Sequence, residues 1–170
     1  MSEDANQEKI NPAIVTAFVK STKNVLSTML GYESQLDKPK LSDEPRPTYD
    51  VSGIVAFTGE VTGSVVVSFN EETALNIVET FTTEKFDIHS EDFADAIGEL
   101  CNMIAGNAKK DFHLEARIGI PSVIIGPGHL VSRLKDVPCV VIPCSCDAGQ
   151  FTVEVNVKQV DPVPVGGTIS

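Results

Sequence analysis

The longest regular pattern of apolar and polar residues lies between Ser90 and Lys110. Apolar residues recur there every three or four positions, as one face of an α-helix requires. That face consists of Phe93, Ile97, Leu100, Ile104 and Ala108. Ser90 suits the N-cap, two acids follow it, and two lysines close the segment, which matches the helix dipole at both ends. The pattern predicts a long amphipathic helix over 90–110.

Two further helices are predicted upstream. Asn11-Pro12 is a typical helix start, and apolar positions continue at helical spacing until Gly31, a typical helix end. Asn70 opens a shorter helix that reaches about Phe81, with two acids in its first turn. A polar connector with three prolines, over 33–48, follows the first helix.

Strand patterns fill the remaining segments. Tyr49–Thr58 and Gly63–Asn70 read as two strands of a hairpin joined around Gly59. Three more β-rich runs follow the long helix, and the pattern leaves open an extension of the first to Leu130. They are Ser122–Ile125, Val137–Cys146 and Gln150–Gln159, with a hairpin turn at 146–149.

The order of these elements predicts an α+β fold in which an antiparallel sheet packs against long helices. A helix followed by a hairpin occurs twice, so we expect pseudo-duplicated halves. Aligning the first helix on the long one places Asn24 opposite Asn102, and Ser21 opposite Glu99. Only the second half would then keep a carboxylate–amide pair. We expect a disordered N-terminus over 1–9, one domain over 10–160 and a flexible tail over 161–170.

Opposite the apolar face of the long helix lies a polar stripe, which consists of Asp95, Glu99, Asn102 and Gly106. These positions fall within about 60° of one another on the helix surface. An exposed polar face is most often only solvated. Burial, however, does not explain a carboxylate, an amide and a bare backbone position together. We therefore predict that this helix presents Glu99 and Asn102 to something outside the chain.

Charge and composition narrow the class of partner. The formal charge of −11 disfavours binding to nucleic acid or to an anionic membrane surface. No run approaches the roughly 18 apolar residues of a membrane span. The N-terminal residues are polar and acidic, unlike a signal peptide. We expect a cytoplasmic protein with reduced cysteines.

Metal and histidine chemistry are weaker interpretations. Cys139, Cys144 and Cys146 cluster, but their spacing differs from that of the usual zinc-binding pairs. Cys144 and Cys146 point to one face of a strand, which suits the core, so we expect no metal site. The three histidines, His89, His113 and His129, have no neighbouring serine, cysteine or acid in a spacing that suggests a triad.

Residues 95–108, DAIGELCNMIAGNA, resemble the signature helix of the CheC/CheX chemotaxis phosphatases. That family carries an Asp/Ser-x3-Glu-x2-Asn motif with a proline further on. Within this family the chain is most similar to CheX. It has a single copy of the motif, a helix that opens at 10–12, and the run at 106–108. Pro121 falls short of the family spacing and Pro127 overshoots it, and Pro121 is the better candidate because it precedes a strand.

This resemblance implies a CheC/CheX-like fold and a phosphatase that acts on the phospho-aspartate of a CheY-type response regulator, in chemotaxis or another two-component pathway. Asn102 would orient the hydrolytic water, and Glu99 would pair with the regulator's lysine. Asp95 would bind at the rim, and Gly106 would leave room for the partner's backbone. The chain would need no cofactor of its own, since the regulator supplies Mg²⁺. A homodimer is also implied, with the valine-rich strands free to pair at a sheet edge.

A second class of function stays open. A non-catalytic relative of the same fold would dock on a regulator or act as a scaffold like the flagellar-switch proteins. Retention of both Glu99 and Asn102 favours the phosphatase, because a scaffold does not need that pair.

Overall fold

The computed structural model describes residues 11–43 and 46–161, which form three helices and one eight-stranded sheet. The elements are α1 (Pro12–Leu30), β1 (Ser34–Leu36), β2 (Lys40–Ser42), β3 (Val51–Gly59), β4 (Val61–Phe69), α2 (Glu71–Thr82), α3 (Glu91–Lys110), β5 (Ala116–Ile118), β6 (Ser122–Ile125), β7 (Cys139–Cys146) and β8 (Gly149–Gln159). The predicted α+β class is confirmed. The predictions for 1–9 and for the tail beyond Asp161 lie outside the described residues.

The predicted helix ends are confirmed within one residue. The Asn11 side chain accepts a hydrogen bond from the Ala13 N–H at 3.0 Å, and Pro12 occupies the first turn of α1. Gly31 ends that helix with φ of 67°, a left-handed conformation that glycine adopts without strain. Asn70 caps α2 through the Thr73 N–H at 2.8 Å. None of the helices that the structure describes is long and apolar enough to cross a membrane.

The sheet is antiparallel, with the strand order β1-β7-β8-β4-β3-β5. Strands β4 and β8 pair along their whole length at its centre. Strand β2 also pairs with β7, and β6 also pairs with β3. The valine-rich strands therefore lie inside the sheet. Our expectation that they would be free at an edge is wrong, because short strands cover β3 and β7.

Three short strands were not predicted. The segment expected to be a polar connector over 33–48 contains β1 and β2, and β5 follows α3. Each has three residues, which is too few for an alternating pattern to be visible. β1 and β2 pair with β7, and β5 pairs with β3, and both partners are far away in the sequence. Local sequence therefore gives little indication of these three short strands.

The strand pairing reveals two similar halves. Strands β1 and β2 act as one interrupted strand along β7, and β5 and β6 do the same along β3. In the two interruptions the Asp37 N–H donates to the Pro143 carbonyl at 2.8 Å, and the Gly119 N–H donates to the Ala56 carbonyl at 2.9 Å. A proline precedes the second part in both halves, as Pro39 and Pro121. The match agrees with the expected pseudo-duplication.

The burial pattern corrects our alignment of the two long helices by one residue. Buried positions coincide when Ile14 is paired with Phe93 and Phe18 with Ile97. The counterparts of Glu99 and Asn102 are then the exposed Lys20 and Lys23, not Ser21 and Asn24. Ser21 is buried, so it has no place in an exposed stripe. Sequence spacing alone did not distinguish these two registers.

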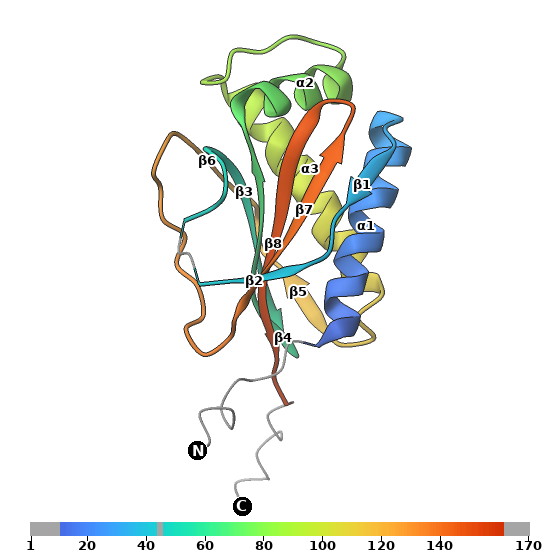
Figure 1. The fold of residues 1–170 in the computed structure, drawn as a ribbon, viewed down its shortest axis with the longest axis vertical. Helices are drawn as coiled ribbons and strands as arrows, with labels where there is room; N and C mark the ends of the chain where they lie inside the picture. The colour runs from blue at the N-terminus through green and yellow to red at the C-terminus, as the bar shows by residue number, and fades with distance from the viewer. Residues whose placement is uncertain (1–10, 44–45, 162–170) are drawn as a thin grey trace, which may run out of the picture.

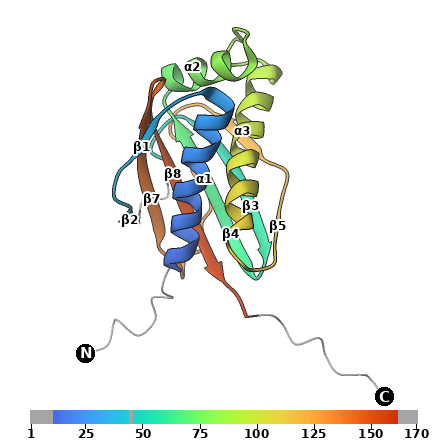
Figure 2. The ribbon, with the colours of Figure 1, turned by 90° about the vertical axis from the view of Figure 1, so that its right-hand side faces the viewer.

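Helices α1 and α3 lie side by side and antiparallel on one face of the sheet, and α2 crosses one end of the molecule (Figure 1, Figure 2). The core between them contains rings such as Phe18, Phe57 and Phe112, whose centroids lie 5.7 to 5.9 Å apart. This packing joins α1, β3 and the segment that directly follows α3.

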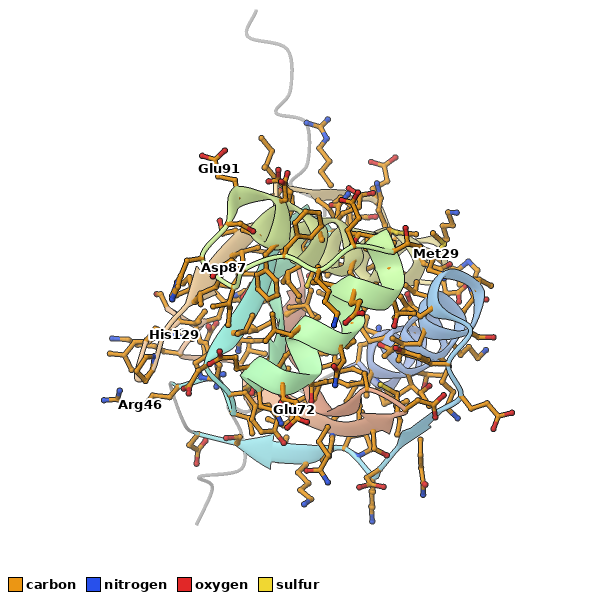
Figure 3. All side chains as sticks on the ribbon, turned by 90° about the horizontal axis from the view of Figure 1, so that it is seen from above. Met29, Arg46, Glu72, Asp87, Glu91 and His129 are labelled. Atoms are coloured by element: carbon orange, nitrogen blue, oxygen red, sulfur yellow. The ribbon has the colours of Figure 1, made fainter. Side chains whose placement is uncertain are left out.

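The loop between β6 and β7 covers the other face of the sheet through polar contacts. Buried Glu154 accepts from Arg133 Nη2 at 2.8 Å and from the Thr48 N–H at 3.0 Å. Arg46 Nη1 donates to the Gly128 carbonyl at 2.7 Å. Figure 3 shows Arg46 and His129 together on the side away from Met29 of α1. The two faces of the sheet thus differ in character, apolar under the helices and polar under the loop.

Candidate functional site

Helix α3 carries the polar stripe, and its ends are set by its own sequence. The Ser90 hydroxyl accepts a hydrogen bond from the Phe93 N–H at 3.2 Å, which confirms the predicted N-cap. Glu91 and Asp92 occupy the first turn, and Lys109 and Lys110 occupy the last. These charges oppose the partial charges at the helix ends and stabilise the helix.

The buried side of α3 is held closely against the sheet and α1. A Cβ atom on Gly53 of β3 would lie 2.2 Å from the Cys101 Sγ, so only glycine allows this approach. The Ser21 hydroxyl of α1 donates to the Ile104 carbonyl of α3 at 2.6 Å. These contacts hold α3 rigidly against β3 and α1, so its exposed side keeps a fixed position in the molecule.

The polar stripe lies where the sequence predicted it. Asp95 and Glu99 are exposed, and Asn102 and Gly106 are half-buried. Among the residues that the structure describes, the Asp95, Glu99 and Asn102 side chains have no hydrogen-bond or ion-pair partner. An amide and two carboxylates are thus free to bind another molecule. Their predicted roles stay predictions, because position and exposure do not test chemistry.

Two glycines of α3 bring the β5–β6 segment against the stripe. A Cβ on Gly98 would lie 3.4 Å from Pro121 Cγ, and a Cβ on Gly106 would lie 3.7 Å from Ile118 Cδ1. Gly106, which we predicted to make room for a partner, therefore also has a neighbour within the chain. Sequence reasoning missed Gly98, although a glycine inside a long helix is itself a signal of close packing. It did select Pro121, and the structure places this proline beside the stripe.

Three of the four cysteines are buried in the core, and Cys146 is half-buried. Burial raises the pKa of Cys101 and of Cys144 to about 12, and that of Cys139 to about 11. Burial also raises the pKa of Cys146. Such thiols stay protonated near neutral pH and pack as small apolar side chains. Within residues 11–43 and 46–161, no group of three or more histidine, cysteine and acidic side chains is arranged to hold a metal ion.

One histidine lies beside a serine, but in a structural arrangement. His129 Nε2 is 2.8 Å from the Ser52 hydroxyl, and its Nδ1 is 2.8 Å from the Gly126 carbonyl. A carbonyl partner makes Nδ1 the protonated nitrogen, so the Ser52 hydroxyl donates to Nε2. Ser52 is fully buried and Asn102 lies on the other face of the sheet. The pair fastens the β6–β7 loop to β3.

Two surface hollows of the described residues lie away from the stripe. One, of about 750 Å³, is lined by residues of the β6–β7 loop such as Leu134. Another, of about 800 Å³, lies between Glu60 and Lys109 at the end of the β3–β4 hairpin. Neither includes a stripe residue. The stripe is thus a helix surface that lies outside these two hollows.

Comparisons of the sequence with known proteins identify its family. The family "Chemotaxis phosphatase CheX" matches residues 51–145, which include all of α3. The chain is 32% identical over 117 residues to the CheY-P phosphatase CheX of Thermotoga maritima, covering 66% of this chain and 76% of that protein.

Solved structures agree with this match. A CheX crystal structure from Desulfovibrio desulfuricans is 34% identical, with a TM-score of 0.76 over 86% of this chain and 99% of that one. CheX of Borrelia burgdorferi, solved as a CheX–CheY–BeF3–Mg²⁺ complex, shares the fold at 24% identity, with a TM-score of 0.69 over 89% of this chain and 100% of that one. A motif-bearing helix, a matching fold and a matching sequence together show that the chain belongs to the CheX family of chemotaxis phosphatases.

Proposed function

We propose that this protein dephosphorylates the aspartyl phosphate of a CheY-type response regulator by inserting Glu99 and Asn102 of α3 into the regulator's active site. One observation carries the proposal: the two side chains project from one face of a rigidly held helix without partners among the described residues. The similarity to the Thermotoga CheY-P phosphatase supports the choice of substrate. Action on such a regulator would place the protein in the cytoplasm.

The proposed role of Asn102 follows from the chemistry of phosphoryl transfer. Hydrolysis of an acyl phosphate requires water in line with phosphorus, so catalysis is mainly positioning and electrostatics. A carboxamide both accepts and donates hydrogen bonds, and it can hold a water molecule without acting as a strong base. Asn102 therefore orients the attacking water, and the carboxylate of the regulator is the leaving group.

Glu99 and the flanking stripe residues position α3 on the regulator. Glu99 lies less than one turn before Asn102, and its exposed carboxylate pairs with the lysine of the regulator's active site. Asp95 binds at the rim one turn earlier, and Gly106 allows close approach one turn later. Mg²⁺ belongs to the regulator and neutralises the phosphoryl oxygens there.

Phosphate release from a phosphorylated CheY-type regulator, with and without the full chain, tests this function. We expect the unaltered protein to accelerate release. Asn102→Ala should lose about 100-fold of that acceleration, or about 3 kcal/mol of barrier, while it still binds the regulator. Lys23→Ala, at the counterpart position on α1, should behave like the unaltered protein. Loss of binding alone in Asn102→Ala would contradict the water-positioning role.

A non-catalytic docking module or a flagellar-switch-like scaffold remains the second candidate function. It would bind the phosphorylated regulator saturably without accelerating phosphate release. The same assay separates the two classes, because binding and turnover are measured on one sample.

We also propose a homodimer, as the resemblance to CheX implies. The outer edges of β1/β2 and β5/β6 have no strand partner among the described residues, and exposed edges are able to pair with a second chain. Light scattering after size-exclusion chromatography gives the oligomeric state. A monomer at micromolar concentration would contradict this proposal without affecting the catalytic one.

A further inference from the structure

We propose that Ile120 is an apolar docking residue that seats the response regulator over Asn102, an inference that rests on the proposed function. Of the large apolar side chains that the structure describes, Ile120 is the most exposed, at 93%. Single exposed apolar residues are common and need no function. The position and rigidity of Ile120 distinguish it from the others.

The two glycine contacts of α3 place Ile120 beside Asn102. Gly98, Asn102 and Gly106 are spaced four residues apart and lie along one row of the helix surface. The first glycine of this row faces Pro121 and the last faces Ile118. The backbone between these two contacts, Gly119 and Ile120, therefore passes next to Asn102.

The local backbone holds Ile120 in place. The Gly119 N–H donates to the Ala56 carbonyl at 2.9 Å, and β6 begins again at Ser122 along β3. Pro121 restricts the backbone of the residue before it to extended conformations. Because Ile120 is β-branched, its first side-chain torsion is also restricted. A residue that is already ordered loses little entropy when a partner covers it.

The other half of the molecule shows that the fold does not require an apolar residue here. The interruption between β1 and β2 has the same hydrogen bond and the same proline, and its residue equivalent to Ile120 is Lys38. That half also carries Lys20 and Lys23 in place of Glu99 and Asn102. At these two equivalent described positions, the exposed isoleucine stands in the half that has the carboxylate–amide pair, and a lysine stands in the other half.

The partner that this arrangement fits is the regulator rather than a second copy of the chain. A regulator whose phosphoryl group reaches Asn102 comes close to the β5–β6 segment, because the backbone of Gly119 and Ile120 passes next to Asn102. An apolar residue beside polar groups excludes water around the hydrogen bonds that carry specificity, as at the centre of typical interfaces. We expect an apolar patch on the regulator next to its phosphorylation pocket.

Ile120→Ser in the full chain tests the inference, with Leu130→Ser as the matched control. Leu130 is 58% exposed and belongs to the loop on the opposite face of the sheet. We expect the KM for the phosphorylated regulator to rise about tenfold in Ile120→Ser, with kcat changed less than about twofold. The Kd for the regulator with BeF3⁻ and Mg²⁺ should rise by the same factor. Leu130→Ser should change neither constant.

The outcomes separate this inference from the proposed function. Acceleration by the unaltered chain with an unchanged KM in Ile120→Ser would overturn the role of Ile120 alone. Loss of self-association in Ile120→Ser without a change in KM would do the same and would assign the residue to a second copy. If the unaltered chain neither binds nor accelerates the regulator, the proposed function fails and the docking role fails with it.

Discussion

Helices α1 and α3 occupy equivalent places in the two halves of this protein, yet their outer surfaces are opposite in character. Both pack on the same sheet face with the same spacing of buried residues, such as Phe18 and Ile97. On the exposed side, α3 carries Glu99 and Asn102, where α1 carries Lys20 and Lys23. The buried sides are alike because the fold constrains them.

The exposed sides differ because folding leaves them free. A solvated helix face changes stability little when its residues change, so its composition is available for function. The comparison thus favours a functional role for the carboxylate–amide pair, in line with the proposed function. It also provides a natural control for each variant of α3.

Exchanging the two surfaces should have the largest effect. The double variant Glu99→Lys/Asn102→Lys gives α3 the residues of α1, and we expect a loss of acceleration of more than about 100-fold. The reverse exchange, Lys20→Glu/Lys23→Asn, should leave the rate unchanged. Phosphate release and circular dichroism on both proteins check activity and folding. Activity retained by the first variant would refute the assignment of the site to α3.

Removing the carboxylate alone should have a smaller effect. Glu99→Ala is expected to lower both affinity and rate, each by about tenfold, because an exposed ion pair contributes only modestly. The loss of affinity should shrink as the salt concentration rises, since salt screens the pair. Lys20→Ala, at the equivalent position of α1, is the control variant. Its binding curves with the regulator should match those of the unaltered protein at each ionic strength.

The close approach of α3 to the sheet should be sensitive to a single methyl group. Gly53→Ala places a Cβ against the Cys101 Sγ, and we expect the free energy of unfolding to fall by about 2 kcal/mol. Adding Cys101→Ala should restore much of the loss. In the half that contains α1, the strand pairing places Val140 of β7 at the position equivalent to Gly53, so that half does not have a glycine there. Urea unfolding measures the effect, and additive losses in the double variant would rule out this contact as the cause.

Two buried hydroxyls of α1 give the smallest and most contrasting effects. Thr22 is the counterpart of Cys101, and its hydroxyl has no hydrogen-bond partner among the described residues. Thr22→Val should therefore stabilise the protein by about 1 kcal/mol. Ser21→Ala should destabilise it by about the same amount, because the Ser21 hydroxyl binds the Ile104 carbonyl of α3. Thermal unfolding measures the change in stability of each variant. Changes in the same direction for Thr22→Val and Ser21→Ala would contradict this account.

Sequence patterns predicted the long elements well and the short ones poorly. The helix spacing, the caps at Asn11, Asn70 and Ser90 and the hairpin strands carry local signals, and all appear in the structure. Strands β1, β2 and β5 have too few residues for such a signal. The predicted alignment of α1 with α3 as equivalent helices differs by one residue from the alignment in the structure. More than one alignment brings the apolar positions of two amphipathic helices close to one another.

The sequence by itself determined the α+β class, the polar stripe and the resemblance to the CheC/CheX family, because each depends on spacing within one continuous segment. Tertiary structure decided which residues surround the stripe. The positions of Pro121 and Ile120 beside α3 depend on the pairing of β5 and β6 with β3, which is far away in the sequence. Only the folded sheet sets which residues meet across such separations, so the surroundings of Asn102 were beyond sequence reasoning.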